Sequence, residues 1–220
     1  GVRSQPTLGL IVTFSPGFLA GQLTEVSLDD RLGVPAAADT KTVVIDYSAP
    51  NVAKEMHVGH LRTTVIGDSL VRTMEFLGHR VIRENHIGDW GTPFGMLIEH
   101  LLDLGEEQAA HRLSLGDLDG FYKEARAKFD GAETFRERAR ERVVKLQAGD
   151  EETRRLWETL VALSTRHFNT VYAQLGVLLT DDDLAGESSY QPLMPEVIDR
   201  LRDAGLLERS YGADVVFPPG

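Results

Sequence analysis

The sequence predicts an α/β fold that holds the first half of a doubly wound parallel sheet together with a helical insertion. Residues 42–47 form a short, β-branched, apolar run of the kind found in buried parallel strands. Residues 57–77 carry apolar side chains at helical spacing, and residues 80–85 have the pattern of a second strand. A strand, a helix, a strand and another helix within about 60 residues indicate a βαβ unit.

The first helix is expected from about His57 to Leu77, and Gly78 follows where a C′ glycine belongs. A second helix is expected from Phe94 to Leu104, with Pro93 in its first turn. The apolar residues of the first helix that follow helical spacing are Leu61, Val65, Ile66, Leu70, Met74 and Leu77.

The flanking regions have different patterns. An apolar run from Leu8 to Phe14 and an amphipathic stretch ending near Leu32 precede a linker of small residues at 34–39. Residues 106–175 are expected to form helices only, and a helix near 194–204 and a strand at 213–217 come last. The residues expected to face the core of the helical region are Leu156, Leu160, Leu163 and Phe168.

Composition excludes several classes of protein. There is no cysteine, which excludes disulfides, thiolate catalysis and cysteine-based metal sites, and the absence of a long apolar run argues against a membrane span. We therefore expect a cytoplasmic protein without a membrane partner. The formal charge of -11 argues against coating nucleic acid by bulk electrostatics. Residues 123–145 nevertheless hold eight Lys/Arg against five Asp/Glu, which fits either a solvated, ion-paired helix face or a local nucleic-acid contact.

The most informative stretch runs from Asp46 to His60, where a strand and a loop lead into a helix. A helix N-terminus exposes unpaired N–H groups and attracts anions. Two imidazoles in its first turn, His57 and His60, add donors that can stabilise charge developing on a phosphate. Gly59 leaves room for a flat base or ribose, and Lys54 offers a point charge for a phosphate. The pattern therefore favours a nucleotide site.

Two other interpretations of this histidine pair stay open. The rings could simply cap the helix, or they could form half of a metal site. No third ligand with a recognisable spacing accompanies the pair, so no metal site is predicted.

The residues around the pair resemble a known family. The run from Ser48 to Arg62, Ser-Ala-Pro-Asn-Val-Ala-Lys-Glu-Met-His-Val-Gly-His-Leu-Arg, resembles the signature of arginyl-tRNA synthetases, the arginine version of the class I His-x-Gly-His motif. A second block covers residues 83–95, although Pro93 stands where the family commonly has Gln. A third, weaker block comprises residues 187–190 and 213–217. The resemblance is strong over residues 42–104 and moderate over 186–217.

The resemblance implies a division of the chain into four segments. Residues 1–36 would be the end of an N-terminal domain plus a linker, and residues 37–105 the first half of a Rossmann-like class I catalytic domain. Residues 106–185 would be a mainly helical insertion, and residues 186–220 the return to the catalytic domain. The chain does not begin with Met and stops just after the last expected strand, so we expect a truncated piece of a longer protein.

The same resemblance implies roles for single residues. His57, His60 and Lys54 would be catalytic, and Lys54, His57, Gly59 and His60 would bind ATP. Asp46 and Asn51 would bind the amino acid, Asp46 as an acidic partner of the cationic substrate. Asp46 fits equally well as a strand-end cap. His86 would line the substrate site, or it would be a packed loop histidine; Trp90 is expected to be a packing anchor.

The implied activity is ATP-dependent ligation of L-arginine to tRNA(Arg) through an arginyl-adenylate, with Mg²⁺ accompanying ATP. The tRNA acceptor end would lie near the helical insertion. No lysine follows Lys145, so the lysine loop of the family is missing, as is its anticodon-binding domain, and the chain alone is expected to be inactive. One alternative is a truncated, free-standing paralogue that binds nucleotide or a partner. A second alternative is a nucleotidyltransferase that uses its own His-x-Gly-His motif. Such an enzyme would be expected to lack the run from Ser48 to Lys54 that precedes the motif here.

Overall fold

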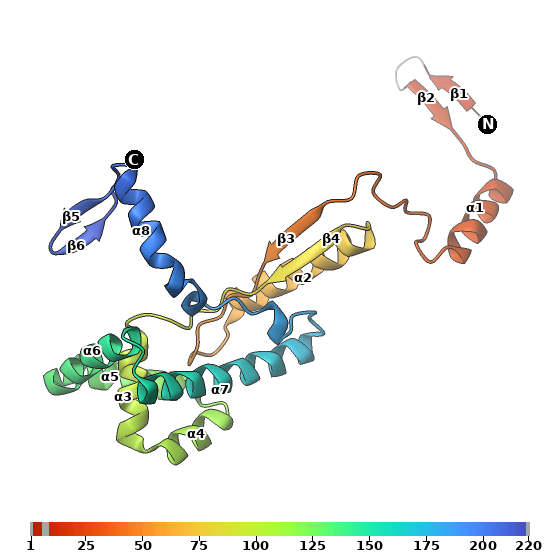
Figure 1. Ribbon diagram of the computed structural model, residues 1–220. Coiled ribbons are helices and arrows are strands. Elements are labelled where there is room, and N and C mark those ends of the chain that lie inside the picture. The colour runs from red at the N-terminus through yellow and green to blue at the C-terminus, as the bar shows by residue number, and fades with distance from the viewer. Residues whose placement is uncertain (1, 6–8, 219–220) are drawn as a thin grey trace. The chain divides into compact units, whose positions relative to one another are not determined.

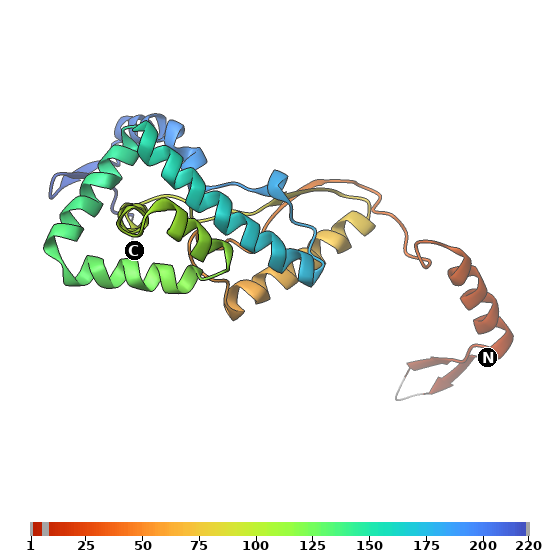
Figure 2. The ribbon, with the colours of Figure 1, turned by 90° about the horizontal axis from the view of Figure 1, so that it is seen from below.

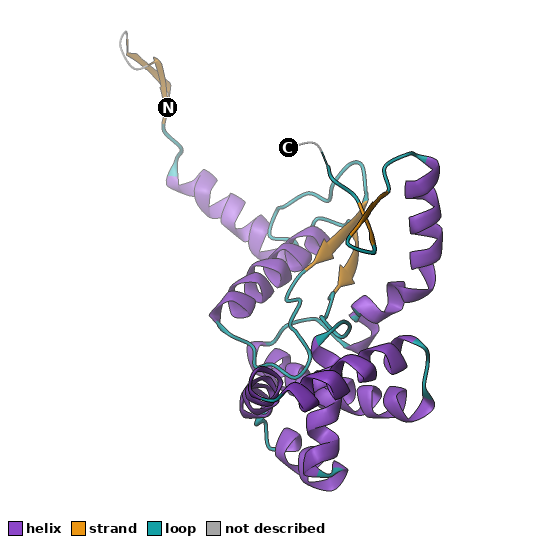
Figure 3. Ribbon diagram, turned by 90° about the vertical axis from the view of Figure 1, so that its left-hand side faces the viewer, coloured by secondary structure: helices purple, strands orange, loops and turns teal. Residues whose placement is uncertain are grey.

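The computed structural model describes residues 2–5 and 9–218, and helices make up most of it (Figure 3). The chain divides into two compact units. The first comprises residues 1–44 and 70–82, and the second comprises residues 45–69 and 83–220.

The first unit begins with an antiparallel hairpin of β1 (Val2–Gln5) and β2 (Gly9–Val12). Leu8, where the expected apolar run begins, lies outside the described residues. Helix α1 (Pro16–Leu28) starts after Ser15, whose Oγ accepts the N–H of Phe18 at 3.2 Å, and it ends four residues before the expected Leu32. None of its residues is buried.

The predicted βαβ unit is present. It consists of β3 (Thr42–Asp46), α2 (Val58–Phe76) and β4 (Arg80–Glu84), and the two strands pair in one sheet (Figure 1). Gly78 has φ +90°, and the N–H of His79 donates to the carbonyl of Met74, so the helix ends through a left-handed C′ glycine as expected. The α/β class and the parallel strand direction are confirmed.

The prediction that residues 42–47 form a buried strand is wrong for most of the strand. Val44 is 60% exposed, and the residues of β3 alternate between exposed and half-buried. A strand is buried on both faces only when layers cover both. In the described part of the chain this sheet has two strands, and β3 is not covered on both faces.

The part of α2 that belongs to the second unit buries small and polar side chains rather than apolar ones. Within the second unit Thr64, Gly67 and Asp68 are buried, whereas Val65 and Ile66 are about half exposed. Gly67 lies against the Tyr47 side chain, which a Cβ at that position would overlap. Asp68 accepts the Tyr47 hydroxyl at 3.3 Å and the N–H of Leu178 at 2.7 Å. Burial, followed by the charge of Asp68, raises the pKa of Tyr47, which therefore stays protonated as a donor.

Five helices follow and pack together within the second unit (Figure 2). The core-facing stripe predicted for the longest of them is confirmed, because Leu156, Leu160 and Phe168 are fully buried and Leu163 is 8% exposed. Gly95 allows close packing: a Cβ there would overlap the backbone carbonyl of Ala139. The five helices are α3 (Pro93–Leu104), α4 (Glu106–Ser114), α5 (Leu118–Gly131), α6 (Glu133–Gln147) and α7 (Glu151–Leu175).

The chain ends in short elements. Two 3₁₀ turns, η1 (Asp181–Asp183) and η2 (Glu187–Leu193), lead to α8 (Met194–Asp203), which confirms the helix expected near 194–204. The expected final strand is present as β6 (Ala213–Val215), which pairs antiparallel with β5 (Glu208–Ser210). No helix among the described residues is long and apolar enough to cross a membrane.

The basic stretch at 123–145 is mostly neutralised by carboxylates. Arg142 contacts Glu99 at 2.7 Å, and Arg138 contacts Asp103 at 3.0 Å. Six of its eight cations lie within ion-pair distance of an acidic side chain, which agrees with the ion-paired helix interpretation. The six are Lys123, Arg126, Lys128, Arg136, Arg138 and Arg142.

Buried His100 predicts a pH-dependent stability. Its side chain is 1% exposed, and burial, followed by the charge of Lys128, lowers its pKa. The folded state therefore resists protonation below the ordinary histidine pKa of about 6.5, whereas the unfolded state takes up the proton. The contribution of His100 to the free energy of unfolding is fully present above that value. It falls as the pH drops towards the lowered pKa, by at most about 1.4 kcal/mol per pH unit for one proton.

We expect the wild-type chain to lose more stability between pH 7 and pH 5.5 than the H100L variant, measured by urea unfolding at each pH. Replacing His111, an exposed residue on α4, with glutamine is the matched control and should leave the profile unchanged. If the free energies of unfolding of wild type and H100L changed with pH in parallel, the pH dependence could not be assigned to His100.

Candidate active site

The loop between β3 and α2 has a strained backbone. Ser48, Ala49 and Ala53 have φ values of +75°, +50° and +57°. Positive φ at non-glycine residues costs of order 1–3 kcal/mol each and persists only where surrounding contacts enforce it. Two side chains do so here: Asn85 Oδ1 accepts the N–H of Ala49 at 3.0 Å, and Ser164 Oγ accepts the N–H of Ala53 at 2.9 Å.

A buried hydroxyl network ties the same loop to α7. Ser48 Oγ lies 2.7 Å from the hydroxyl oxygen of Tyr172, which also accepts a hydrogen bond from Asn85 Nδ2 at 3.1 Å. All three residues are at most 3% exposed. Burial raises the pKa of Tyr172 and keeps its proton in place. Helix α7 therefore sets the conformation of the signature loop. Nothing in the sequence pairs Tyr172 or Ser164 with this loop.

The backbone around Asn51 is held by the loop segment at Gly88. The N–H of Val52 donates to the carbonyl of Gly88, and the N–H of Gly88 donates to the carbonyl of Pro50, both at 3.0 Å. Gly88 is essential to this contact because a Cβ there would overlap Asn51 Oδ1. Asn51 itself is exposed. Its side chain thus lies at a defined point on the surface of the loop.

The two signature histidines lie at the start of α2, and their rings are in contact at an angle of 34° between the ring planes. The ring centroids are 4.0 Å apart. The N–H of His57 donates to Nδ1 of His60 at 3.2 Å, and the N–H of Gly59 donates to Nδ1 of His57 at 3.1 Å. The rings therefore do cap the helix, as one of the open interpretations held, since they satisfy N–H groups that a helix start leaves unpaired.

Capping through Nδ1 decides the tautomer. A neutral imidazole that accepts at Nδ1 carries its proton on Nε2, so His57 and His60 both have Nε2–H groups left as donors. Burial, followed by the charge of His57, lowers the pKa of His60 and keeps its ring neutral near pH 7. Gly59 is required for this arrangement, because a Cβ there would lie 2.9 Å from Cε1 of His57.

Lys54 is directed towards the helical region. Its Nζ lies 4.4 Å from the ring centroid of Tyr122 on α5. Among the described residues no carboxylate lies within ion-pair distance of this ammonium group. Lys54 thus carries an uncompensated charge next to the histidine pair in sequence.

The predicted substrate residues Asp46 and His86 lie together. Asp46 Oδ1 accepts the N–H of His86 at 3.3 Å, and Asp46 Oδ2 lies 3.2 Å from His86 Nδ1. The second contact lacks hydrogen-bond alignment, so it is a close electrostatic contact rather than a hydrogen bond. Tyr190 stacks on His86 at 5.8 Å between ring centroids, and its hydroxyl is hydrogen-bonded to His86 Nε2. Tyr190 belongs to the third resemblance block, but its contact with His86 was not predicted.

Asp89 and Trp90 anchor the same region structurally. Asp89 accepts hydrogen bonds from the N–H and Oγ of Ser188 at 2.8 and 2.7 Å, and its carbonyl accepts Trp157 Nε1 at 2.6 Å. The two tryptophan rings meet edge to face at 5.6 Å. Trp90 is therefore a packing anchor, as expected.

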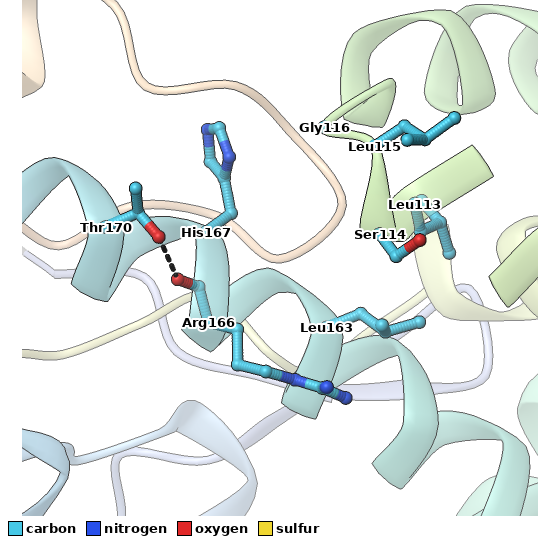
Figure 4. A pocket seen from close by; sticks show the side chains of 8 residues that line it. All are labelled: Leu113, Ser114, Leu115, Gly116, Leu163, Arg166, His167 and Thr170. Atoms are coloured by element: carbon cyan, nitrogen blue, oxygen red, sulfur yellow. Dashed lines mark hydrogen bonds between the residues drawn. The ribbon is translucent and has the colours of Figure 1, made fainter. Parts of the chain in front are cut away.

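A surface pocket of about 430 Å³ lies in the helical region, between the α4–α5 turn and α7 (Figure 4). Arg166 and His167 project from α7 in different directions, and the Thr170 hydroxyl donates to the Arg166 carbonyl at 3.0 Å. None of the residues singled out for the nucleotide or amino-acid site lines this pocket. Among the described residues no group of three His, Asp or Glu side chains could hold a metal ion.

Comparisons with known proteins show the family of the chain. Residues 22–219 match the family model described as tRNA synthetases class I (R), catalytic domain. Arginine–tRNA ligases of Thermobifida fusca and Shigella sonnei are 56% and 52% identical over 95% and 94% of the chain. The chain spans about a third of the length of these relatives, 36% in each case. The crystal structure of an arginyl-tRNA synthetase from Plasmodium falciparum superposes with a TM-score of 0.68 at 30% identity, over 99% of this chain and 38% of that one. The chain therefore belongs to the class I arginyl-tRNA synthetase catalytic-domain family.

Proposed function

We propose that this chain carries the ATP and arginine sites of an arginine–tRNA ligase, which joins L-arginine to tRNA(Arg) through an arginyl-adenylate. The observation that supports this most directly is the histidine pair. Two Nε2–H donors and an uncompensated lysine belong to one strained loop and the helix start that follows it. These groups suit a triphosphate, because each offers a donor or a positive charge and none offers a competing carboxylate.

The residues would act by position and charge. ATP supplies the α-phosphate that the arginine carboxylate attacks, and Mg²⁺ would accompany it, although no residue of this chain is assigned as its ligand. His57 and His60 would donate through Nε2 to phosphate oxygens as charge develops on them. Lys54 would hold a phosphate as a point charge, and Gly59 would leave space for the nucleotide. This chemistry depends mainly on orientation and electrostatic stabilisation.

Arginine would bind beside Asp46. The Asp46 side chain is 49% exposed, so one face of its carboxylate remains for a cationic ligand. His86 and Tyr190 border it, and Asn51 would receive the α-amino group. Asp46 could bind arginine and still act as a strand-end cap, since the same carboxylate also accepts the N–H of His86.

The acceptor end of tRNA(Arg) is proposed to lie near the helical region at 106–185. Most cations of the basic stretch are paired, which leaves Arg140 and Lys145 without an ion pair among the described residues. We propose these two as the cations of that stretch most available to a phosphate backbone. The expected cytoplasmic location and the four-segment division of the chain remain predictions.

The decisive experiment is amino-acid-dependent pyrophosphate exchange, assayed in the presence of tRNA(Arg), by the protein encoded by the complete reading frame. Arginine should support exchange, and lysine and glutamine should not. Activation of lysine or glutamine as efficient as that of arginine would overturn the assignment. Binding of ATP without any exchange would favour the nucleotide-binding paralogue instead.

The D46N variant tests the arginine site within the same assay. Asparagine keeps an oxygen for the N–H of His86 but removes the charge that would pair with the substrate. We expect the KM for arginine to rise about 10- to 100-fold, the range of a charge-assisted hydrogen bond, with the KM for ATP unchanged. An unchanged KM for arginine would leave Asp46 with the cap role alone.

A further inference from the structure

Lys54 differs from the two lysines of the helix it faces. Lys123 and Lys128 on α5 are each ion-paired, with Asp119 and Asp103 respectively. Lys54 has no such carboxylate among the described residues, and its contact is with the aromatic face of Tyr122 at 4.4 Å. Nothing in the sequence pairs these two residues, because Lys54 lies in the loop between β3 and α2 whereas Tyr122 lies far along the chain on α5.

An aromatic face holds a cation in a way that a carboxylate does not. The ring quadrupole attracts the ammonium group and restricts its side chain, but it contributes no net negative charge. A carboxylate partner would neutralise the lysine and would compete with an incoming phosphate. Tyr122 therefore keeps the Lys54 charge in place and available.

The backbone beneath this lysine is already fixed. Ala53 is fully buried with φ +57°, and its N–H is held by Ser164. The N–H of Lys54 donates to the carbonyl of Asn51 at 3.3 Å. The remaining freedom of Lys54 lies in its side-chain torsions, which are the torsions that a contact at Nζ restricts.

We propose that Tyr122 is a positioning residue for Lys54, so that a helix of the 106–185 region sets the position of an ATP-site cation. This inference rests on the proposed function, in which Lys54 holds an ATP phosphate. Tyr122 acts only through Lys54 and does not contact the substrate.

The test compares Y122F, which keeps an aromatic face, with Y122L, which removes it. The readout is arginine-dependent pyrophosphate exchange by the protein encoded by the complete reading frame. Y122L should raise the KM for ATP about two- to five-fold, the range that a cation–π contact at an exposed site supplies, with kcat and the KM for arginine nearly unchanged. Y122F should match the wild type. In a K54A background, Y122L should have no further effect.

Several outcomes would overturn the inference. These are a wild-type KM for ATP in Y122L, equal damage by Y122F, or a Y122L effect that persists in the K54A background. A fall in kcat together with the thermal midpoint would mean that Tyr122 is merely structural. Failure of the proposed function is recognised separately, because wild-type protein would then show no arginine-dependent exchange. In addition, NMR should show an upfield ring-current shift of the Lys54 ε-methylene that is kept in Y122F and lost in Y122L.

Discussion

Replacing His60 with alanine is expected to lower arginine-dependent adenylation by about 100- to 1,000-fold, the usual effect of removing one transition-state donor. The structure gives the reason: His60 is held neutral, its Nδ1 is occupied by the N–H of His57, and its Nε2–H remains to donate. Because the donor acts on charge that develops during the reaction, kcat should fall more than the KM for ATP rises. Pyrophosphate exchange by the complete protein measures both.

Two further variants separate catalysis from helix capping. H60N keeps an acceptor near the Nδ1 position and therefore preserves the cap, whereas H60Q places an amide N–H nearer the Nε2 position. If the ring serves only as a cap, H60N should be almost fully active. If the donor matters, H60N should be as impaired as H60A, and H60Q should recover part of the loss. H111Q serves as the control for an exposed histidine on α4, and circular dichroism checks that each variant folds.

Replacing Glu99 with alanine is expected to destabilise the helical region by about 3–5 kcal/mol, the cost of removing the closest partner of a buried charge. The other carboxylate near Arg142, that of Glu152, lies 3.9 Å away and is exposed. The side chains of Glu99 and Arg142 are 6% and 11% exposed, and Arg142 contacts Glu99 Oε1 at 2.7 Å. Arg142 also donates to Thr153 Oγ1 at 3.0 Å, so the pair links α3 to α6 and to the start of α7. Urea unfolding followed by circular dichroism gives the change in the free energy of unfolding.

An exposed ion pair of similar geometry provides the matched control. Glu106 and Arg155 also lie 2.7 Å apart, but both side chains are about half exposed, so water screens their interaction. E106A should therefore cost only a small fraction of what E99A costs. If both variants lost the same free energy of unfolding, the burial of Glu99 would not strengthen its ion pair with Arg142. E99Q keeps an acceptor for Arg142 and should fall between wild type and E99A.

The order of elements and the position of the candidate site in the chain could be predicted from local sequence patterns. The βαβ unit, the helices of residues 106–175 and the start of α2 at the histidine pair follow from side-chain periodicity and from Gly78 and Pro93. Local patterns suffice because they reflect interactions between residues a few positions apart. The signature from Ser48 to Arg62 likewise indicates the family from residue types and their order alone.

Exposure could not be predicted in the same way. Val44 has the residue type of a buried strand and is 60% exposed, and α2 buries Thr64 and Asp68 while Ile66 is exposed. Periodicity shows which residues share a face of a helix, but the packing partners decide which face is buried. Here the partner is the Tyr47 side chain, which needs Gly67 opposite it.

The sequence by itself determined the α/β class, the family and the choice of residues proposed for the nucleotide site, because these depend on residue type and local spacing. Only the tertiary structure decided what holds those residues. Tyr172 contacts Ser48 across 124 positions and Ser164 contacts Ala53 across 111, while α5 brings Tyr122 to Lys54. Such pairs leave no periodic signal, since they form only when packing of the helical region places distant side chains against a strained loop.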